Sequence, residues 1–126
     1  MKTLIVEDNT TYSAILRESL QCLFPSMIIH EATEGNEALQ KVHALRPELI
    51  FMDIRLPGAN GLQLTQSIKK SYPGTNVIIL TSYDTPEYRE AVAQCGATWF
   101  IAKDSMNLGQ VETLVKLALS EVTKFK

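Results

Sequence analysis

The stretch Leu49-Ile50-Phe51-Met52-Asp53 decides the fold class, because four apolar residues follow one another without interruption and end at an acid. An unbroken apolar run of this length is typical of a strand buried on both faces, as in a parallel sheet. Similar runs occur on both sides of it, at Leu4-Ile5-Val6, Met27-Ile28-Ile29, Val77-Ile78-Ile79-Leu80 and Trp99-Phe100-Ile101. The sequence therefore predicts five short buried strands.

The stretches between these runs have the spacing of amphipathic helices, with apolar residues recurring every three or four positions. The positions are Tyr12, Leu16, Ser19 and Leu23; Ala38, Leu39, Val42 and Leu45; Leu64 and Ile68; Tyr88, Ala91, Val92 and Cys95; and Leu108, Val111, Val115, Ala118, Leu119 and Val122. Asp84-Thr85-Pro86-Glu87 has the residues of a helix start, whereas Tyr72-Pro73-Gly74 and Cys95-Gly96 are typical of helix ends.

Alternating strands and helices predict a three-layer α/β fold with right-handed crossovers. We expect a single (βα)₅ domain over residues 1–126, a doubly wound parallel five-stranded sheet with helices on both faces. The flavodoxin-like strand order 2-1-3-4-5 is the leading arrangement, although periodicity alone does not determine strand order.

The composition fits a globular domain, with 45% apolar and 21% charged residues among 126. The net charge is −2 and the basic residues are scattered, so no direct nucleic-acid binding by this domain is expected. No apolar run approaches the roughly 20 residues of a membrane span, and no signal peptide opens the chain. Cys22 and Cys95 lack a paired spacing, which favours small buried side chains in a reduced, cytoplasmic compartment. His30 and His43 likewise lack the spacing of metal ligands.

Polar side chains follow four of the predicted strands. Ligands of doubly wound folds bind at the carboxyl ends of the strands, where the strand order reverses. The first strand ends in Glu7-Asp8, the third in Asp53, the fourth in Thr81-Ser82, and the fifth is followed by Lys103. The second strand ends in Glu31-Ala32 at the expected sheet edge, too far away to contribute.

Each of these residues has a simpler explanation when taken alone. Asp8 could cap a helix, Asp53 could form a turn, Thr81 could be an ordinary strand-end residue, and Lys103 could be a surface charge. The convergence of four separate segments at one end of the sheet favours a functional site instead.

The chemistry of this set points to phosphoryl transfer. Three crowded carboxylates repel one another unless a hard divalent cation such as Mg²⁺ neutralises them. An ionised carboxylate is also a nucleophile that can form an acyl phosphate. Phosphoryl transfer then depends mainly on positioning and charge neutralisation, which a cation, a lysine and a hydroxyl donor supply. We expect Asp53, Mg²⁺, Lys103 and Thr81 to play these parts.

Four segments, in order along the chain, carry a family resemblance. They are Leu4–Asp8 (LIVED), Ile50–Gly61 (IFMDIRLPGANG), Ile79–Ser82 (ILTS) and Gly96–Lys103 (GATWFIAK). Over its whole length the chain resembles the receiver domain of two-component response regulators. Lys103-Asp104 is similar to receivers of the LuxR/NarL kind, which are attached to helix-turn-helix DNA-binding domains.

The resemblance implies a role for each matching residue. Asp53 would accept a phosphoryl group from a phosphohistidine of a sensor kinase or phosphotransfer protein, and the domain would catalyse only its own phosphorylation and dephosphorylation. The Mg²⁺ ligands would be Asp53, Asp8, Glu7 through water, and the backbone carbonyl of Arg55. Thr81 and Lys103 would contact the phosphoryl oxygens. Phe100 matches the aromatic switch position, or is a plain core aromatic.

Two residues depart from the usual pattern. Glu7 stands where aspartate is more usual, so its extra methylene alters the geometry of the metal site slightly. Asp104 stands where many receivers have proline, which removes the usual reason to expect a cis peptide after Lys103. The resemblance places Arg55 and Tyr83 at positions flanking the pocket that modulate hydrolysis in this family, and their bulk predicts slow hydrolysis of the phosphoryl group.

The output is less determined by the sequence. The expected role is transcription regulation through a DNA-binding domain that this chain does not contain; a stand-alone receiver and a phosphorylation-independent interaction module are the alternatives. A cofactor-binding flavodoxin relative and an aspartyl phosphatase fit Glu7-Asp8-Asn9-Thr10 poorly. Leu117 lies nearly opposite the apolar stripe of the last helix, with Leu114 at its margin. Leu117 is either an isolated exposed leucine or part of a homodimer or effector contact.

Overall fold

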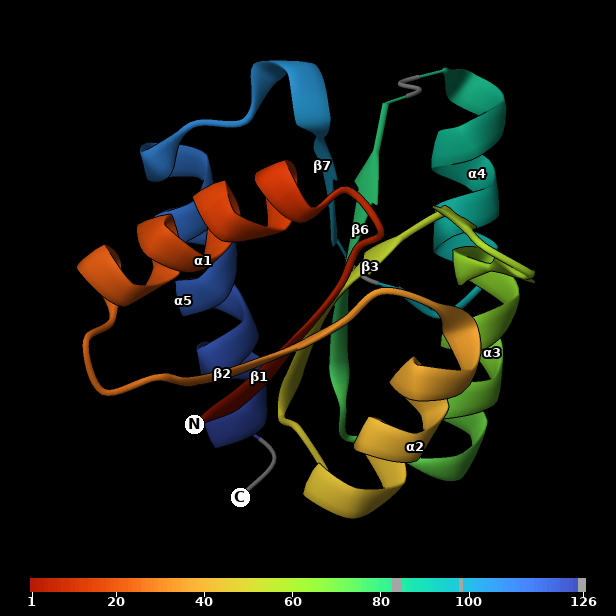
Figure 1. Cartoon of the computed structure of the whole chain (residues 1–126), viewed down its shortest axis with the longest axis horizontal. Helices are drawn as coiled ribbons and strands as arrows, with labels where there is room; N and C mark the ends of the chain where they lie inside the picture. The colour runs from red at the N-terminus through yellow and green to blue at the C-terminus, as the bar shows by residue number, and fades with distance from the viewer. Residues whose placement is uncertain (83–84, 98, 125–126) are drawn as a thin grey trace.

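A computed structural model describes residues 1–82, 85–97 and 99–124 (Figure 1). Five strands form one parallel sheet in the order β2-β1-β3-β6-β7, which confirms the predicted 2-1-3-4-5 order. The strands are β1 (Lys2–Val6), β2 (Ile28–Ala32), β3 (Leu49–Asp53), β6 (Asn76–Thr81) and β7 (Trp99–Ala102). The predictions on Tyr83 and Asp84, and on the side chains of Leu119 and Val122, fall outside the described part.

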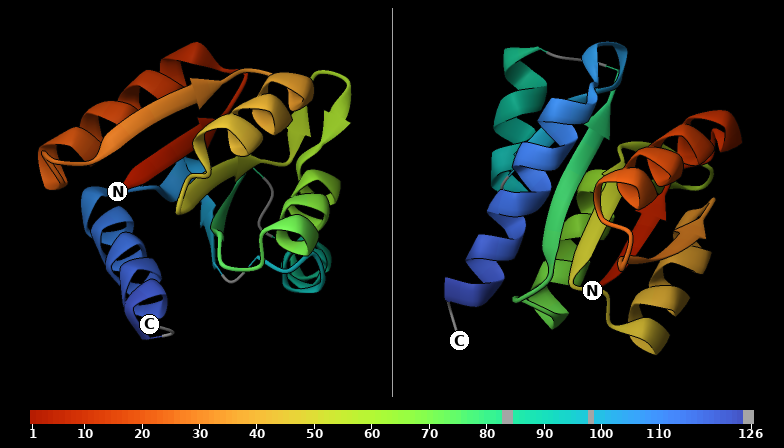
Figure 2. Two further views of the ribbon diagram at one scale, coloured as in Figure 1. Left: turned by 90° about the horizontal axis from the view of Figure 1, so that it is seen from below. Right: turned by 90° about the vertical axis from the view of Figure 1, so that its left-hand side faces the viewer.

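Helices cover both faces of this sheet (Figures 1 and 2). Helices α1 (Thr10–Leu23) and α5 (Leu108–Lys124) pack on one face, whereas α2 (Gly35–Leu45), α3 (Gly61–Ser71) and α4 (Pro86–Gln94) pack on the other. A short antiparallel hairpin, β4 (Arg55–Leu56) and β5 (Ala59–Asn60), follows β3 and was not expected from the sequence. A 3₁₀ turn at Lys103–Ser105 follows β7.

The central strands are buried on both faces, as predicted. In β3, Ile50 and Met52 belong to the core beneath α2, α3 and α4, and Leu49 and Phe51 to the core beneath α1 and α5. The two edge strands depart from this pattern because each has a neighbour on one side only. Ile28 of β2 is 53% exposed, and Phe100 of β7 is half-buried.

Side-chain caps set the start of the helices. Asn9 caps α1, and its side chain accepts a hydrogen bond from the Tyr12 backbone N–H at 3.1 Å. The alternative interpretation of Asp8 as the helix cap is therefore wrong, and its carboxylate is left outside the cap. Thr85 caps α4 and Pro86 opens it, as the start signal indicated.

Two predicted burial assignments are wrong. Cys22 is exposed whereas Cys95 is buried, because Cys22 follows buried Leu20 by two residues and so points about 200° away from the α1 face that packs on the sheet. Leu108 is 51% exposed because it is the first residue of α5 and precedes the buried part of that helix. Leu117 is 46% exposed, as its helical position predicted; its role in a contact stays a prediction.

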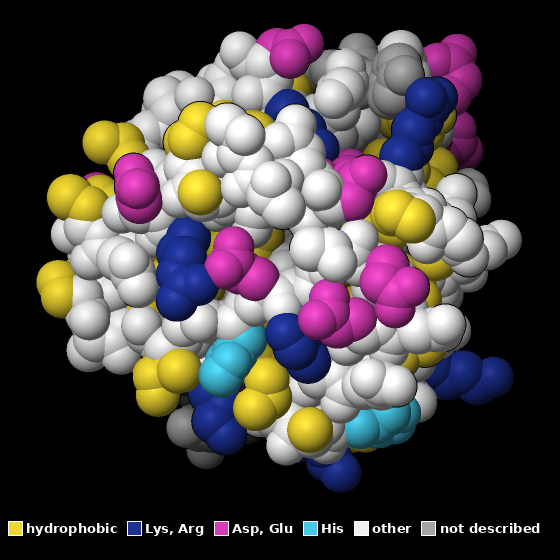
Figure 3. Space-filling model, in the orientation of Figure 1, with side chains coloured by type: hydrophobic (Ala, Val, Ile, Leu, Met, Phe, Trp, Pro, Cys, Tyr) yellow, Lys and Arg dark blue, Asp and Glu magenta, His cyan; other side chains and the backbone are white. Residues whose placement is uncertain are grey.

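Charges of both signs are interspersed on the face drawn in Figure 3, without a broad basic area there. Within the described ranges, no helix has both the length and the apolar character needed to cross a bilayer.

Candidate functional site

A pocket of about 300 Å³ lies at the carboxyl ends of the central strands. Six residues singled out from the sequence line it, namely Glu7, Asp8, Asp53, Arg55, Thr81 and Lys103, together with Asn9, Ile54 and Ser82. The fold thus brings together residues from four segments of the chain, as the sequence predicted. Glu31 is absent from the lining, because its carboxylate bonds Ser13 and Arg17 instead. Phe100 does not line the pocket either.

Three carboxylates converge in this pocket. One oxygen from each of Glu7, Asp8 and Asp53 lies within 4.8 Å of the other two. Glu7 and Asp53 are buried, whereas Asp8 is exposed at the mouth. Hard oxygen ligands at such a spacing suit a divalent cation that keeps part of its water shell, as Mg²⁺ does. The donor set therefore fits the expected metal.

Lys103 already neutralises part of this charge. Its ammonium forms ion pairs with Glu7 Oε1 and with Asp53 Oδ2, the latter at 3.3 Å. Burial alone would lower the pKa of Lys103, but the hydrogen bond to Glu7 and the charge of Asp53 outweigh it and raise the pKa above its usual value. The ammonium is thus held in its charged form beside Asp53.

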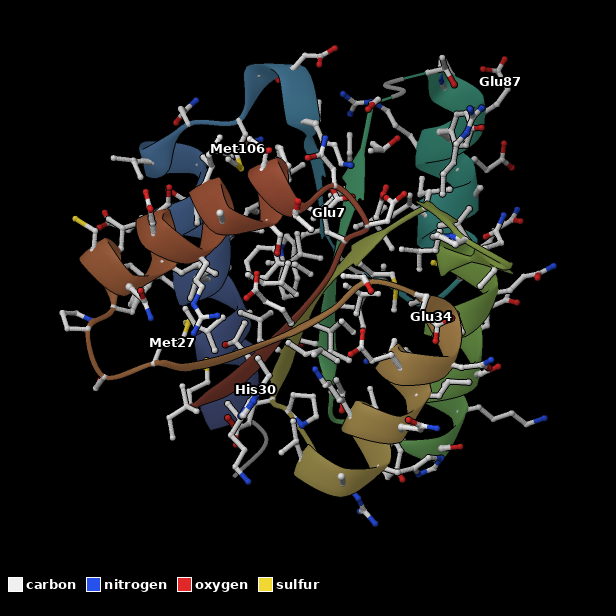
Figure 4. All side chains as sticks on the ribbon, viewed as in Figure 1. Glu7, Met27, His30, Glu34, Glu87 and Met106 are labelled. Carbon is white, nitrogen blue, oxygen red and sulfur yellow. The ribbon has the colours of Figure 1, made fainter. Side chains whose placement is uncertain are left out.

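Burial makes the ionised form of Glu7 unfavourable. Its side chain is 0% exposed, and burial raises its pKa to about 7; Lys103 lowers that pKa and the neighbouring Asp53 raises it. Its Oε2 accepts the backbone N–H of Asn9 at 3.1 Å, which fixes the carboxylate at the end of β1 (Figure 4). A cation beside Glu7 would favour the ionised form, so the site gains most from a metal at this position.

The loop after β3 positions Asp53. The Gly61 backbone N–H donates to the Ile54 carbonyl at 2.7 Å, so the start of α3 lies directly against the end of β3. A Cβ atom on Gly61 would lie 1.9 Å from the Asp53 carbonyl oxygen, and only glycine allows this approach. The β4–β5 hairpin holds Arg55 at the pocket, where its side chain is exposed.

Thr81 and Phe100 lie on neighbouring strands and on the same face of the sheet. Alternation along β6 and β7 directs both toward the face covered by α4, since Ile79 and Phe100 pack in the core on that side. Thr81 is buried and lines the pocket, whereas Phe100 is half-buried beneath the Arg89 guanidinium, 4.6 Å from its ring centroid. The switch role of Phe100 therefore stays a prediction.

Sequence analysis missed one aromatic residue at the site. Tyr12 was assigned only to the packing face of α1, but its ring centroid lies 5.0 Å from Lys103 Nζ. Its place in the first turn of α1, the helix that directly follows the acids Glu7-Asp8, was the available signal.

Comparisons with known proteins agree with this geometry. The family model of the response regulator receiver domain matches residues 3–116. The oxygen regulatory protein NreC of Staphylococcus haemolyticus is 36% identical over 83% of this chain and 49% of its own length. The DNA-binding transcriptional activator EvgA of Escherichia coli K12 is 31% identical over 85% of this chain and 52% of its own. The chain thus spans about half the length of the curated relatives it matches.

A solved structure supports the same fold. A CheY-like response regulator receiver domain from Methanospirillum hungatei JF-1 is 30% identical and superposes with a TM-score of 0.86. The match covers 99% of this chain and 98% of that one.

Proposed function

The chain belongs to the response regulator receiver family of two-component signalling, and from that premise we propose that Asp53 is its phosphoryl acceptor. The observation that carries this proposal is the contact between the buried Asp53 carboxylate and the Lys103 ammonium, inside a pocket with two further acids. A carboxylate oxygen is a nucleophile that can form an acyl phosphate, and the Lys103 ammonium places a positive charge beside it.

In the proposed step, an Asp53 carboxylate oxygen attacks the phosphorus of a phosphohistidine on a sensor kinase or phosphotransfer protein. The phosphorus–nitrogen bond breaks, the imidazole nitrogen takes the electron pair and then a proton, and an aspartyl phosphate forms. Lys103 moves from sharing two carboxylates to pairing with a phosphoryl oxygen. Its charge offsets the negative charge that the phosphoryl group adds.

The same acids would hold Mg²⁺, which supplies charge neutralisation for the incoming phosphoryl oxygens. We assign Asp8 and Asp53 as direct ligands, Glu7 as a ligand through water, and the Arg55 backbone carbonyl as the remaining protein ligand. Asp8 is exposed at the mouth of the pocket, which suits the side from which a hydrated ion enters.

Thr81 would donate its hydroxyl to another phosphoryl oxygen and so report the modification to the rest of the fold. We propose that Phe100, on the same side of the sheet, then turns inward. Because EvgA is a DNA-binding transcriptional activator, we further propose that the output is transcription regulation in the cytoplasm, and that the domain modifies no substrate other than itself.

The test is phosphorylation by acetyl phosphate with Mg²⁺, followed by intact mass. We expect the mass increment of one phosphoryl group in the wild type and in Asp104→Asn, an exposed aspartate beside the pocket. Asp53→Asn should show none. No increment in the wild type would favour the phosphorylation-independent interaction module, and an undiminished increment in Asp53→Asn would place the acceptor elsewhere.

The output is tested separately in the source organism. Transcript profiles of strains carrying the wild-type and Asp53→Asn alleles should differ if phosphorylation controls transcription. Matching profiles under a stimulus that phosphorylates the wild type would contradict the transcriptional role and favour the stand-alone receiver.

A further inference from the structure

We propose that Tyr12 is a positioning residue for Lys103, whose ammonium its ring holds beside the acceptor. The inference rests on the proposed function of Lys103 and adds a residue of α1 to the site. Lys103 Nζ lies 5.0 Å from the Tyr12 ring centroid and contacts Glu7 and Asp53 at the same time. A cation within about 6 Å of an aromatic centroid is attracted by the ring quadrupole, most strongly where water is excluded. The Lys103 side chain is 14% exposed, so this contact is largely shielded from water.

Tyr12 is held at its backbone and at its hydroxyl. The backbone N–H of Tyr12 donates to the capping side chain of Asn9 at 3.1 Å, which sets its place at the start of α1. Its hydroxyl donates to Met106 Sδ at 2.9 Å, across 94 positions of sequence. Tyr12 also packs against the core beneath α1 and α5. The ring therefore has little freedom to move away from the lysine.

Met106 contacts both Tyr12 and the turn that begins at Lys103. Lys103 begins the 3₁₀ turn that ends at Met106, where the Met106 backbone N–H bonds the Lys103 carbonyl at 3.5 Å. Figure 4 shows Met106 beside the first turns of α1. Met106 thus ties the turn that carries Lys103 to the helix that carries Tyr12. The Tyr12 hydroxyl serves this link rather than the pocket, and the ring face is the part of Tyr12 that meets the ammonium.

A lysine needs such support more than an arginine would. Its charge sits at the end of a flexible four-carbon stem, and its ammonium has no fixed plane to direct it. At this site the ammonium must stay beside Glu7 and Asp53. The Tyr12 ring occupies the α1 side of the ammonium and so favours that arrangement before a phosphoryl group arrives.

The test compares side chains of similar size with and without a ring. Tyr12→Phe keeps the ring face and loses the link to Met106, whereas Tyr12→Leu removes the ring. We expect the phosphorylation rate constant with acetyl phosphate and saturating Mg²⁺ to stay within about twofold of wild type for Tyr12→Phe. It should fall about three- to tenfold for Tyr12→Leu, the range expected for loss of one cation–π contact.

A double variant distinguishes the positioning of Lys103 by Tyr12 from a general structural role of Tyr12. In a Lys103→Met background, adding Tyr12→Leu should change the residual rate less than twofold, because the partner of the ring is already gone. Proton NMR of the metal-free protein gives a readout independent of activity. The ε-protons of Lys103 should show an upfield ring-current shift in the wild type and in Tyr12→Phe, and lose it in Tyr12→Leu.

Three results would overturn the inference. A wild-type rate in Tyr12→Leu, an equal loss with and without Lys103, or an unchanged Lys103 proton shift would each do so. If Tyr12→Leu shows no cooperative unfolding transition, Tyr12→Met is measured in its place and judged by the same limits. A wild-type protein that takes up no phosphoryl group would overturn the proposed function and this inference with it, whereas normal wild-type uptake combined with any of the three results removes Tyr12 alone.

Discussion

Glu7 places an acidic group in a buried part of the fold, beside a second carboxylate. Its side chain is fully buried beside Asp53, and its pKa is raised from 4.5 to about 7 by burial, against the opposing effect of Lys103. A carboxyl whose pKa is higher in the folded state destabilises the fold once pH exceeds its unfolded pKa. At neutral pH the metal-free protein therefore carries an internal cost that a bound cation would offset.

Replacing Glu7 by glutamine should separate these two effects. We expect Glu7→Gln to raise the free energy of unfolding of the metal-free protein at pH 7.5 by about 1–2 kcal/mol, since part of the shift is recovered when the charge is removed. The added stabilisation by Mg²⁺ should shrink at the same time. Thermal denaturation with EDTA and with MgCl₂ measures both quantities.

The matched control for this substitution is Glu112→Gln, on α5. Glu112 forms an exposed i,i+4 pair with Lys116, and its loss should change stability by less than about 0.5 kcal/mol in either condition. A Glu7→Gln protein that is less stable than wild type without metal would show that the Lys103 ion pair outweighs the cost of burial.

At the scale of elements, Glu31 joins β2 to α1. Its carboxylate accepts from Ser13 Oγ at 2.6 Å and from Arg17 Nη1 at 2.5 Å. The hydrogen bond from Ser13, followed by that from Arg17, lowers the pKa of Glu31 although burial opposes the shift. A lowered pKa in the folded state contributes stability above the unfolded pKa, and that contribution is lost as pH falls through the folded value.

We therefore expect Glu31→Gln to destabilise the domain at pH 7 and much less in acid. The difference in unfolding free energy should be about 0.5–1 kcal/mol at neutral pH, a modest value because the side chain is partly exposed. It should shrink as pH falls below about 4.5, the unfolded pKa of a glutamate. Urea denaturation across this pH range measures it, with exposed Glu18→Gln as the control. A difference that grows on acidification would contradict the assignment.

The junction of β3 and α3 depends on Gly61. A methyl group there would overlap the backbone carbonyl of Asp53, 1.9 Å away, and backbone cannot turn aside as a side chain can. Gly61→Ala should cost about 2–4 kcal/mol of stability and slow the proposed phosphorylation of Asp53, because the end of β3 must shift. Gly74→Ala is the matched control, since a Cβ at Gly74 would have nothing within 4 Å and the φ of Gly74 is not in the left-handed region. Thermal melts and the acetyl phosphate assay measure the two effects. Wild-type stability and a wild-type rate in Gly61→Ala would show that the junction relaxes, and would contradict this prediction.

For the whole molecule, the sequence patterns predicted the sheet and most of the pocket lining, because both follow from short stretches of sequence. Uninterrupted apolar runs mark buried parallel strands, and their ends meet at one edge, so Asp53 and Lys103 could be paired without knowing any distance. The β4–β5 hairpin and the Tyr12 ring were missed. Hairpins of two-residue strands leave no periodicity to detect, and the ring lies near Lys103 only because the turn at Lys103–Ser105 folds back over α1.

Two separate cores share the central sheet, and this arrangement should couple them into one unfolding unit. Trp99 is the single tryptophan and packs with the core beneath α1 and α5, whereas buried Ile68 of α3 lies in the core on the other face. Ile68→Val should cost about 0.5–1.5 kcal/mol and shift the urea midpoints of Trp99 fluorescence and far-UV circular dichroism equally. Exposed Ile28→Val should move neither midpoint appreciably. If Ile68→Val moved the dichroism transition and left the fluorescence transition in place, the two faces would unfold independently. The proposed phosphorylation at the pocket would then have no single cooperative sheet through which to affect both faces.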